Sequence, residues 1–463
     1  MLLQVGLQVP QPWIDLGQGD LERPHGPPPP VVGTRRVRYP CGEYTQDGGG
    51  RGIAPEGGDR RMRVRRWLWA LALLVSPACG PLARPPRLLV LWHALDRERA
   101  AALARLTEAY MAEHPESAIY IEAFPGPAEL RARLERPSER GPDLLVVPAE
   151  MVPDLFQAGR LVPLARWLED PTLGLPPEER GDLLAPLTPG SVPFLREGLL
   201  LYADLDRLME SGFDQPPADW EAVRQVCVRG ALDLNGDGRP DTAGWVAPRD
   251  GWVLQGWLAG RSRRSAQGIL ERVQTMLRWG CAQLLEPSTA LRMFVQGETA
   301  MLFGPSRWLP ELERKAAAGR LRFRLAAAPP PYRPDFERPV LAGWGWDLAI
   351  AAADPGQQQA AWAFLRWTLR PEVQARWAQE AHSLPLRRSV GERLRGLLGS
   401  ASLQSSLVEW TLEGYQEGAW VDGGTAARLT EALRLLEGGV EVPAVLAPLP
   451  IPEEAEISEE VGR

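Results

Sequence analysis

The sequence predicts an α/β fold that begins with an open, mainly parallel sheet. Three short apolar segments, at 87–95, 118–124 and 142–150, have the length and composition of strands. Between them, in 103–115 and 126–135, apolar side chains recur at three- or four-residue spacing, as on one face of a helix. This order predicts a β-α-β-α-β unit, and such sheets bind ligands beyond the carboxyl ends of their strands.

The rest of the chain continues the alternation. Residues 191–212 indicate an extended segment followed by a helix, and a mostly helical region comes next. The later predicted elements are a strand and turn at 297–308, an apolar strand at 339–351, a helix at 357–369, a break at 383–390 and two more helices. Residues 446–463 are expected to form an acidic, disordered tail.

The composition is that of a globular protein, 44% hydrophobic and 24% charged, and 463 residues suffice for two domains. The net charge of -7 does not indicate a nucleic-acid partner. No segment reaches the ~18 uninterrupted apolar residues of a transmembrane helix. The 18 tryptophans suit ligands that are partly apolar and partly polar, because indole has an apolar face and one N–H group.

The amino-terminal part has the layout of an export signal. Residues 1–61, rich in Pro, Gly and Arg, are expected to be disordered or to precede a true start at Met62. Residues 62–79 combine arginines, an apolar run and small residues, as a secretory signal does. They resemble a bacterial lipoprotein signal ending on Cys79, which we expect to be lipidated; plain secretion is the alternative. Residues 80–87 would then tether an exported protein to the outer face of the cytoplasmic membrane, or leave it in the periplasm.

Two cysteines remain in the folded part of the chain, Cys227 and Cys281. In an oxidising compartment they can form a disulfide. Two buried free thiols are the alternative.

The order of segments closely resembles the extracellular solute-binding proteins of ABC import systems, the family of maltose-binding and related sugar-binding proteins. The resemblance covers residues 87–445. Six landmarks carry it, in order: "LWHAL…LARLTEAYMAEHP", "PDLLVVPAEMVPDLFQAGRLVPL", "VPFLREGLLLYADLDRLMESGFDQPPADWEAV", "FVQGETAMLFGPSRW", "GWGWDLAI" and "AAWAFLRWTLRPEVQARWAQEAHSLPLRRS".

The resemblance implies a two-lobe periplasmic-binding-protein fold of type II, with parallel-rich sheets flanked by helices. The chain would cross between lobes near 191–198, 339–345 and 384–388. Lobe 1 would comprise 87–190 plus 345–383, and lobe 2 would comprise 199–338 plus 389–445. A sugar or oligosaccharide would be held between the lobes, and a closed form would deliver it to the membrane subunits of an ABC permease. We expect a monomer that requires no cofactor.

Several residues are candidates for ligand contacts. Glu150 matches the position where sugar-binding relatives place an acidic residue that accepts hydrogen bonds from sugar hydroxyls. Trp344 and Trp346 share one face of a strand, and one of them is expected to face the ligand. Trp308 follows a Gly-Pro turn where the family places an aromatic sugar platform, although Ser306 is the alternative there. The predicted ligand-binding residues are Trp92, His93, Glu150, Arg196, Tyr202, Trp245, Trp308, Trp344, Trp346 and Trp420. A core or surface role is the alternative for each.

The segment 233–245 has the ligand spacing of a calcium loop. Positions 1, 3, 5, 7 (through its carbonyl) and 9 of such a loop are occupied by Asp233, Asn235, Asp237, Arg239 and Asp241. Gly244 stands where a bidentate Glu is usual, so we expect a weak structural Ca²⁺ site. A metal-free cluster of Asx turns is the alternative.

Two other classes of function remain open. An exported carbohydrate-active enzyme would share the export route, but the sequence contains no nucleophile elbow, phosphate loop or helical His pair, and we predict that the protein is not an enzyme. A ligand-sensing surface protein would partner a receptor instead of a permease.

Overall fold

The computed structural model describes residues 87–136, 141–238, 240–332, 340–400, 402–417 and 423–452. The contacts of the chain divide it into two units, 1–79 and 80–463, and every described residue belongs to the second. The predictions for the export signal, Cys79, the Arg239 carbonyl and Trp420 fall outside the described residues. Among the described residues, no helix combines the length and apolarity needed to cross a membrane.

The first lobe contains the predicted β-α-β-α-β unit. Its strands are β1 (Arg87–His93), β2 (Ser117–Ala123) and β3 (Leu144–Pro148), all parallel in the order β2-β1-β3. Helices α1 (Arg97–Glu113), α12 (Pro355–Thr368) and α13 (Pro371–Glu380) share a core with one face of this sheet. Helices α2 (Pro127–Glu135) and α3 (Val152–Gln157) share a core with the other face. The short helices of this lobe are η1 (Ala149–Met151), α4 (Ala165–Leu168) and α5 (Pro177–Gly181).

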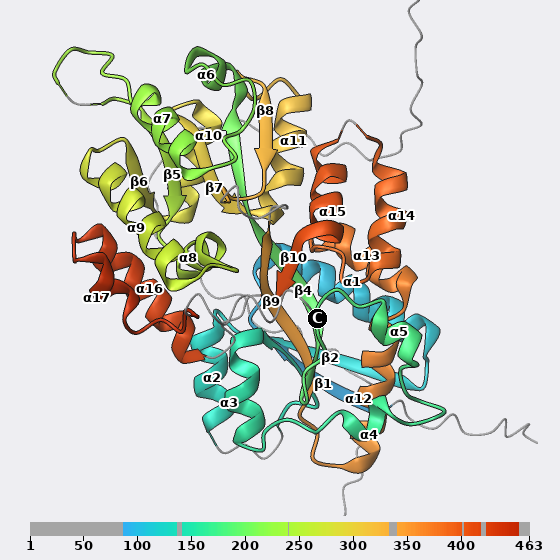
Figure 1. Cartoon of the computed structure of the whole chain (residues 1–463). Coiled ribbons are helices and arrows are strands. Elements are labelled where there is room, and N and C mark those ends of the chain that lie inside the picture. The colour runs from blue at the N-terminus through green and yellow to red at the C-terminus, as the bar shows by residue number, and fades with distance from the viewer. Residues whose placement is uncertain are drawn as a thin grey trace, which may run out of the picture. The chain divides into compact units, whose positions relative to one another are not determined.

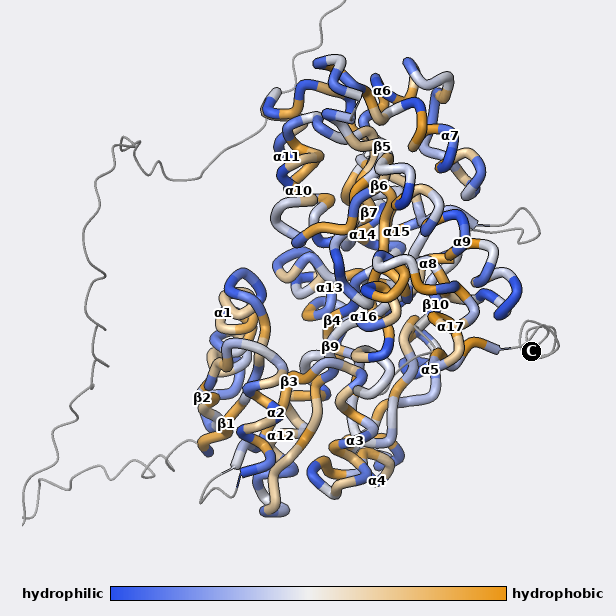
Figure 2. The backbone as a smooth tube through the Cα atoms, turned by 90° about the vertical axis from the view of Figure 1, so that its left-hand side faces the viewer, coloured by the Kyte–Doolittle hydropathy of each residue, from blue (hydrophilic) through white to orange (hydrophobic). Residues whose placement is uncertain are grey.

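Strand β3 shows why the strands of this sheet have continuously apolar sequences. All five of its residues are buried. Leu144 and Val146 belong to the core with α1, whereas Leu145 and Val147 belong to the core with α2. Because side chains alternate along a strand, a strand covered by helices on both faces needs apolar residues at every position. Figure 2 shows the resulting hydrophobic colours along β1 and β3.

The second lobe has its own sheet and helices. Its strands are β5 (Ala243–Pro248), β6 (Ala282–Leu285), β7 (Thr299–Pro305) and β8 (Leu325–Ala328). Its helices are α6 (Leu205–Glu210), α7 (Trp220–Gly230), α8 (Gly251–Leu258), α9 (Arg263–Arg278), α10 (Pro287–Gln296), η2 (Ser306–Trp308) and α11 (Leu309–Ala317). One core gathers three tryptophans and Phe303, and a second core contains Tyr202 and Trp308.

Two long strands, β4 (Ser191–Asp204) and β9 (Leu341–Ile350), connect the lobes (Figure 1). β9 pairs with β3 of the first lobe, and β4 pairs with β9 through Gly198 and then with β7 of the second lobe from Leu199. Both of these pairings of β4, and the β3–β9 pairing, are antiparallel. The sheet is therefore mixed: β1, β2 and β3 are parallel and so are β5, β6 and β7, whereas β4 pairs antiparallel with β9, β7 and β8.

The carboxyl-terminal helices are divided between the lobes. α14 (Arg388–Leu398) and α15 (Leu403–Gly414) pack against α13 of the first lobe, and β10 (Tyr415–Glu417) pairs with β9. α16 (Gly423–Glu437) and α17 (Val442–Leu446) join the core of the second lobe. The segment 389–445 thus serves both lobes rather than lobe 2 alone. The tail was predicted to begin at 446, but Leu446, Leu449 and Ile451 are buried in this core, and residues 453–463 lie outside the described part of the chain.

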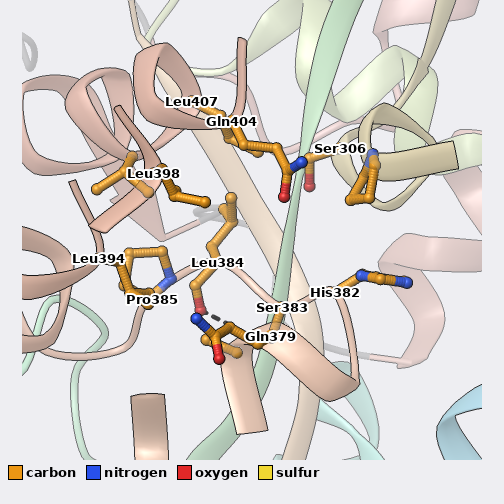
Figure 3. Close-up of a pocket in the computed structure, with 13 residues that line it drawn as sticks. Ser306, Gln379, His382, Ser383, Leu384, Pro385, Leu394, Leu398, Gln404 and Leu407 are labelled. Carbon is orange, nitrogen blue, oxygen red and sulfur yellow. Dashed lines mark hydrogen bonds between the residues drawn. The ribbon is translucent and has the colours of Figure 1, made fainter. Parts of the chain in front are cut away.

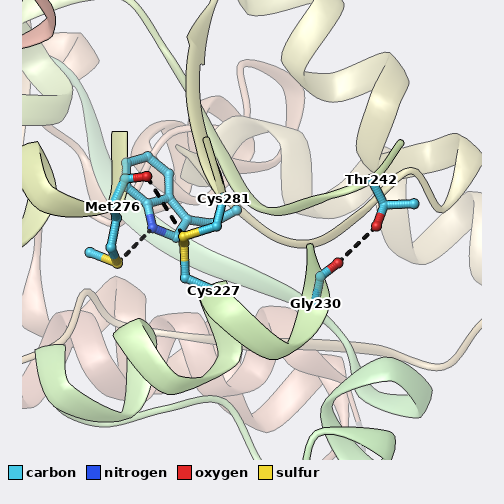
Figure 4. Close-up of a disulfide and its surroundings, with 6 residues drawn as sticks. Cys227, Gly230, Thr242, Met276 and Cys281 are labelled. Atoms are coloured by element: carbon cyan, nitrogen blue, oxygen red, sulfur yellow. Dashed lines mark hydrogen bonds between the residues drawn. A yellow bond between two sulfur atoms is a disulfide. The ribbon is translucent and has the colours of Figure 1, made fainter. Parts of the chain in front are cut away.

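The two cysteines of the second lobe are joined (Figure 4). Cys227 lies on α7 and Cys281 directly precedes β6, and their Cα atoms are 5.4 Å apart. Gly244 at the start of β5 packs on the backbone of Cys227, where a Cβ would lie only 2.2 Å from the Cys227 carbonyl oxygen. The bridge therefore fixes α7 to the edge of the second sheet, next to the segment 233–245.

Candidate functional site

A charged cluster lies where the first crossing strand meets both lobes. Glu197 of β4 has a side chain that is only 3% exposed. It forms ion pairs with Arg99, at the start of α1 in the first lobe, and with Arg307 of η2 in the second lobe. The distance from Arg307 Nη1 to Glu197 Oε2 is 2.5 Å. One carboxylate on the connecting strand thus links cations from the two lobes.

Burial shapes the ionisation of this cluster. It lowers the pKa of Arg99 to about 10, with repulsion from Arg307 as a further cause, and it lowers the pKa of Arg307. Asp96 and Asp250 oppose the shift of Arg307 because they lie close enough to attract its charge. Buried charges are tolerated where such partners surround them.

An aromatic pair borders Glu197. Trp344 of β9 lies directly opposite Glu197 of β4, and cross-strand partners share a face of the sheet. The indole of Trp344 stacks on that of Trp252 from α8, with ring centroids 4.9 Å apart and planes inclined by 21°. Trp344 and Trp346 are the partly exposed residues of β9, whose other residues are buried. Both tryptophans of the "GWGW" motif can therefore present an aromatic surface.

Asp250 precedes Trp252 at the start of α8. Burial raises the pKa of Asp250, and a hydrogen bond with the Trp252 side chain opposes that rise. We call Asp96, Arg99, Glu197, Asp250, Trp252, Arg307 and Trp344 the crossing-strand site. Its members follow the carboxyl ends of β1, β5 and β7 or lie on β4 and β9, which is where ligands bind to open α/β sheets.

Arg196 points away from this cluster. It forms a buried ion pair with Asp347 of β9, with 2.8 Å between Nη2 and Oδ1, and its Nη1 donates a hydrogen bond to the Trp346 carbonyl at 3.0 Å. Ser191 Oγ donates to the second Asp347 oxygen. This network joins β4 to β9 and is close to Glu150.

Burial raises the pKa of Glu150, and the nearby Asp347 carboxylate raises it further. Glu150 itself is partly exposed, in η1 directly after β3.

Trp92 and His93 do not lie at a ligand surface. Trp92 is 2% exposed, with its ring 5.2 Å from that of Phe124 and the Arg133 guanidinium over it. His93 is 1% exposed, and its Nδ1 accepts a hydrogen bond from the Leu95 N–H. Burial lowers the pKa of His93. Both residues are buried because helices cover β1 on both faces.

Three further candidates belong to the core of the second lobe. Tyr202 is buried and donates its hydroxyl hydrogen to the Pro305 carbonyl at 2.8 Å. Trp245 is buried between Trp257 and Phe303, and its N–H faces the Met276 sulfur. Trp308 packs over Gly304 in the same core as Tyr202. Ser306, the alternative to Trp308, has its hydroxyl engaged by the Gly198 N–H.

Sequence reasoning chose Arg196 and missed its neighbour Glu197, and it also missed Asp96, Asp250 and Arg307. A signal for Glu197 was present, since a charged residue inside the apolar run of 191–204 must find a buried partner. Asp96, Asp250 and Arg307 follow the carboxyl ends of β1, β5 and β7. Because arginine and aspartate are frequent in this sequence, these three residues cannot be recognised as site residues before the fold is known.

A small cavity of about 70 Å³ lies at the third crossing (Figure 3). His382, Ser383 and Leu384 line it together with Ser306 of η2 and side chains of α14 and α15. The Leu384 N–H donates to the Arg196 carbonyl, which ties this crossing to β4. His382 has a positive φ of 51°, and its Nε2 is 3.3 Å from Glu98 of the first lobe. The cavity thus belongs to the connection between the lobes.

The predicted calcium loop forms a cluster of turns. Asp233 accepts hydrogen bonds from the N–H groups of Gly236 and Gly238, and Asp241 accepts from those of Leu234 and Asn235. Among the described residues, no three Asp, Glu, His or Cys side chains converge in a way that could hold a metal ion. The loop in this conformation therefore does not gather a calcium ligand set, and calcium binding stays a prediction.

Two α/β lobes joined by crossing strands, with charged and aromatic side chains of both lobes at the crossing, define a two-lobe ligand-binding protein. The chain belongs to the family of bacterial extracellular solute-binding proteins, whose sequence profile matches residues 105–398. No curated protein matches the sequence.

Solved structures show the same fold at low sequence identity. The cyclic alpha-maltosyl-1,6-maltose binding protein from Arthrobacter globiformis is 18% identical, covers 78% of this chain and 96% of its own, and has a TM-score of 0.61. UgpB from Mycobacterium tuberculosis, in complex with glycerophosphocholine, is 17% identical, with 81% and 97% covered and a TM-score of 0.60. The maltose/maltodextrin-binding domain MalE from Bdellovibrio bacteriovorus, bound to maltotriose, is 15% identical, with 81% and 100% covered and a TM-score of 0.59.

Proposed function

We propose that this protein captures a sugar or oligosaccharide between its two lobes and delivers it to an ABC permease. One observation carries the proposal: Glu197 on a connecting strand binds Arg99 of one lobe and Arg307 of the other, beside the stacked indoles of Trp344 and Trp252. A ligand held there contacts both lobes. It can therefore favour one relative position of the lobes, which a permease can recognise.

The chemistry of the site favours a neutral carbohydrate. The three carboxyl groups of Asp96, Glu197 and Asp250 outnumber the two guanidinium groups of Arg99 and Arg307, so the site has no surplus positive charge for an anionic ligand. Carboxylates and guanidinium groups accept from and donate to hydroxyl groups, and indole faces stack on the C–H faces of sugars. Two of the similar structures are described with maltose-type oligosaccharides, and a third with glycerophosphocholine. The lack of surplus positive charge supports the oligosaccharides over the phosphodiester.

The proposal includes attachment of a monomer to the membrane through lipidated Cys79. The extracellular family supports export, and the lipoprotein-like sequence before Cys79 supports the anchor. Mass spectrometry of the mature amino terminus tests it, since lipidation adds acyl chains to Cys79 and removes residues 1–78. A mature chain that carries an unmodified residue at this point would contradict the anchor.

Tryptophan fluorescence and calorimetry with a panel of mono- and oligosaccharides test the binding function. We expect one sugar class to bind, Trp344→Ala to weaken that binding at least tenfold, and Trp279→Ala, a change at an exposed indole on the end of α9, to leave it unchanged. Chromatography of the sugar after incubation tests for an enzyme. Conversion of the sugar, or equal affinity of the two variants, would contradict the proposal.

A further inference from the structure

An open groove of about 570 Å³ lies at the end of the first lobe that is remote from the second lobe (Figure 1). We call it the basal groove. One wall is formed by residues of the segment 159–166, which leads from α3 into α4. The other wall is formed by 351–353, directly after β9, and by Gln358 in the first turns of α12. The groove is therefore separate from the crossing-strand site, whose Trp344 lies in the part of β9 near the second lobe.

Two cations line the basal groove. They are Arg160 and Arg166, and the described lining residues include no carboxylate. Arg166 donates a hydrogen bond from Nη2 to the Gln358 side chain, and its guanidinium lies 4.7 Å from the centre of the Trp167 ring. These contacts hold the Arg166 cation in one orientation. Arg160 is exposed, so its charge is available to a ligand.

The surface around the basal groove carries charges of both signs. Asp170 and Asp354 accept hydrogen bonds from backbone N–H groups that follow them, after α4 and at the start of α12, and Glu169 is exposed. An anionic group on this surrounding surface would meet carboxylates as well as cations. Inside the groove it meets two guanidinium groups, which bind phosphate oxygens through charge-assisted hydrogen bonds.

The basal groove lies beside the point where the described chain begins. Arg87, the first residue of β1, donates from Nη1 to the Gly356 carbonyl at 2.8 Å. The Leu88 carbonyl accepts from the Gln357 side chain, also at 2.8 Å. Both partners belong to the first turn of α12, and the residue after Gln357 lines the groove. Because the chain from Cys79 to Arg87 spans at most about 30 Å, a lipid anchor on Cys79 keeps this end of the lobe near the membrane.

Exposed apolar side chains accompany the arginines on this part of α12. Leu88 is 41% exposed and Leu173 is 39% exposed. The Leu173 carbonyl accepts a hydrogen bond from the Trp362 indole of α12, and Trp362 stacks on the partly exposed Trp167. Tryptophan, leucine and arginine together suit a membrane surface, where cations meet headgroups and apolar groups meet the acyl boundary.

We infer that the basal groove binds the phosphate headgroup of an anionic phospholipid, so that the anchored protein rests on the membrane with this end of its first lobe. Two arginines without a lining carboxylate match the charge of the headgroup, and the short connection to Cys79 brings the two together. This inference rests on the proposed function, because it requires the acyl chains on Cys79. The docked protein can still capture its solute, since the crossing-strand site lies at the other end of β9.

Hydrogen exchange of the mature lipoprotein in vesicles tests this docking. Vesicles of phosphatidylcholine alone are compared with vesicles in which half of the lipid is replaced by phosphatidylglycerol. We expect the backbone amides of 159–168 and 351–358 to exchange more slowly in the anionic vesicles, and salt at about 0.5 M to remove the difference. Equal exchange of these segments in the two kinds of vesicle would overturn the inference.

A double variant tests the two arginines. Arg160→Glu combined with Arg166→Glu should reduce the slowing at least about tenfold, because one cation at an anionic surface accounts for roughly fivefold. Both side chains are exposed, and thermal melting verifies that the variant folds. Arg320→Glu is the matched control, an exposed arginine beyond the end of α11 in the second lobe. Slowing that persists in the double variant, or that Arg320→Glu also removes, would overturn the inference.

Further outcomes separate this inference from its alternatives. Millimolar glycerol phosphate, added to the protein in phosphatidylcholine vesicles, should not slow exchange at the groove; if it slows exchange as strongly as the anionic vesicles do, the groove binds a free phosphate ester and membrane docking is wrong. Calorimetry should give the same sugar affinity for the wild type and the double variant. A mature chain without acyl groups would contradict the anchor and the docking but leave sugar capture intact. Docking by a protein that binds no sugar would contradict sugar capture alone.

Discussion

At the residue scale, adjacent side chains of one strand have separate tasks. Arg196 and Glu197 are both buried charges, but Arg196 joins β4 to β9 through Asp347, whereas Glu197 meets Arg99 and Arg307. Successive side chains of a strand point to opposite faces, so one position stabilises the connection and the next is available to the site. A substitution at either position therefore tests a different property.

Glu150→Gln tests the ionisation of the predicted sugar contact. Burial raises the pKa of Glu150 above its ordinary value of 4.5, so the folded protein retains this proton to higher pH than the unfolded chain does. Stability is then lost as pH rises through the folded pKa. We expect Glu150→Gln to melt above the wild type at pH 7 and to lose this difference below about pH 4.5.

Calorimetric melting between pH 4 and pH 8 measures this effect. The control is Glu108→Gln, which removes an exposed carboxylate from α1 and should shift the melting temperature equally at each pH. Glu150→Gln should also bind sugar more weakly than the wild type does, since an amide accepts fewer hydrogen bonds than a carboxylate. If the wild type melts above Glu150→Gln at pH 7 and this difference disappears in acid, the pKa of Glu150 is lowered instead.

At the element scale, the disulfide fixes α7 beside the second sheet. Cys227 and Cys281 are 54 residues apart, and a bridge that closes such a loop stabilises a protein by about 4 kcal/mol through the entropy of the unfolded chain. We expect the double variant Cys227→Ser, Cys281→Ser to lose up to this amount in guanidinium unfolding. The wild type with a reductant should match it, and a reductant should leave the variant unchanged. A variant as stable as the oxidised wild type would show that the bridge contributes nothing.

The segment 233–245 is the element for which calcium remains a prediction. Its spacing matches a calcium loop, but its carboxylates accept backbone N–H groups, and position 12 is Gly244. If calcium binds, millimolar calcium should raise the melting temperature of the wild type and leave that of Asp237→Ala unchanged. Magnesium is the control, because it demands a stricter geometry. No shift at millimolar calcium would leave the loop as a set of Asx turns.

The elements of both lobes were largely predictable from the sequence, and the faces of the crossing strands were not. β1, α1, β3 and β9 follow from apolar runs and helical spacing that the structure confirms. In β4, however, the pairing with β9 shifts between Pro193 and Leu195. A bulge of one residue reverses which side chains face which side, so alternation alone could not separate Arg196 from Glu197.

The tryptophans show a related limit. One of Trp344 and Trp346, which share a face of the strand, was expected to face the ligand, and both are partly exposed. Trp245 lies within β5 and Trp308 follows β7, yet both are buried in the second lobe. Which of 18 indoles is covered depends on helices that approach from distant parts of the chain, such as α9 over Trp245.

At the scale of the whole molecule, the ion pairs of Glu197 couple the two lobes. Removing its charge leaves Arg99 and Arg307 close together and largely buried, with Asp96 and Asp250 but without the carboxylate that contacts both cations. Loss of one partner from a buried ion pair typically costs about 3–5 kcal/mol. We therefore expect Glu197→Gln to be destabilised by roughly this amount and, because the two cations repel each other across the crossing, to have a larger radius of gyration in X-ray scattering.

A double variant and a surface control identify the cause of this change. Glu197→Gln combined with Arg307→Gln removes one of the two cations, so it should regain part of the stability and the compactness of the wild type. Glu431→Gln breaks an exposed pair with Arg434 on α16 and should cost less than about 1 kcal/mol. If Glu197→Gln resembles Glu431→Gln in stability and in scattering, the lobes are coupled through packing at β4 and β9 alone. If it expands while the double variant does not, the charge on Glu197 holds the lobes together, and a ligand that hydrogen-bonds to Glu197 acts directly on the contact that couples them.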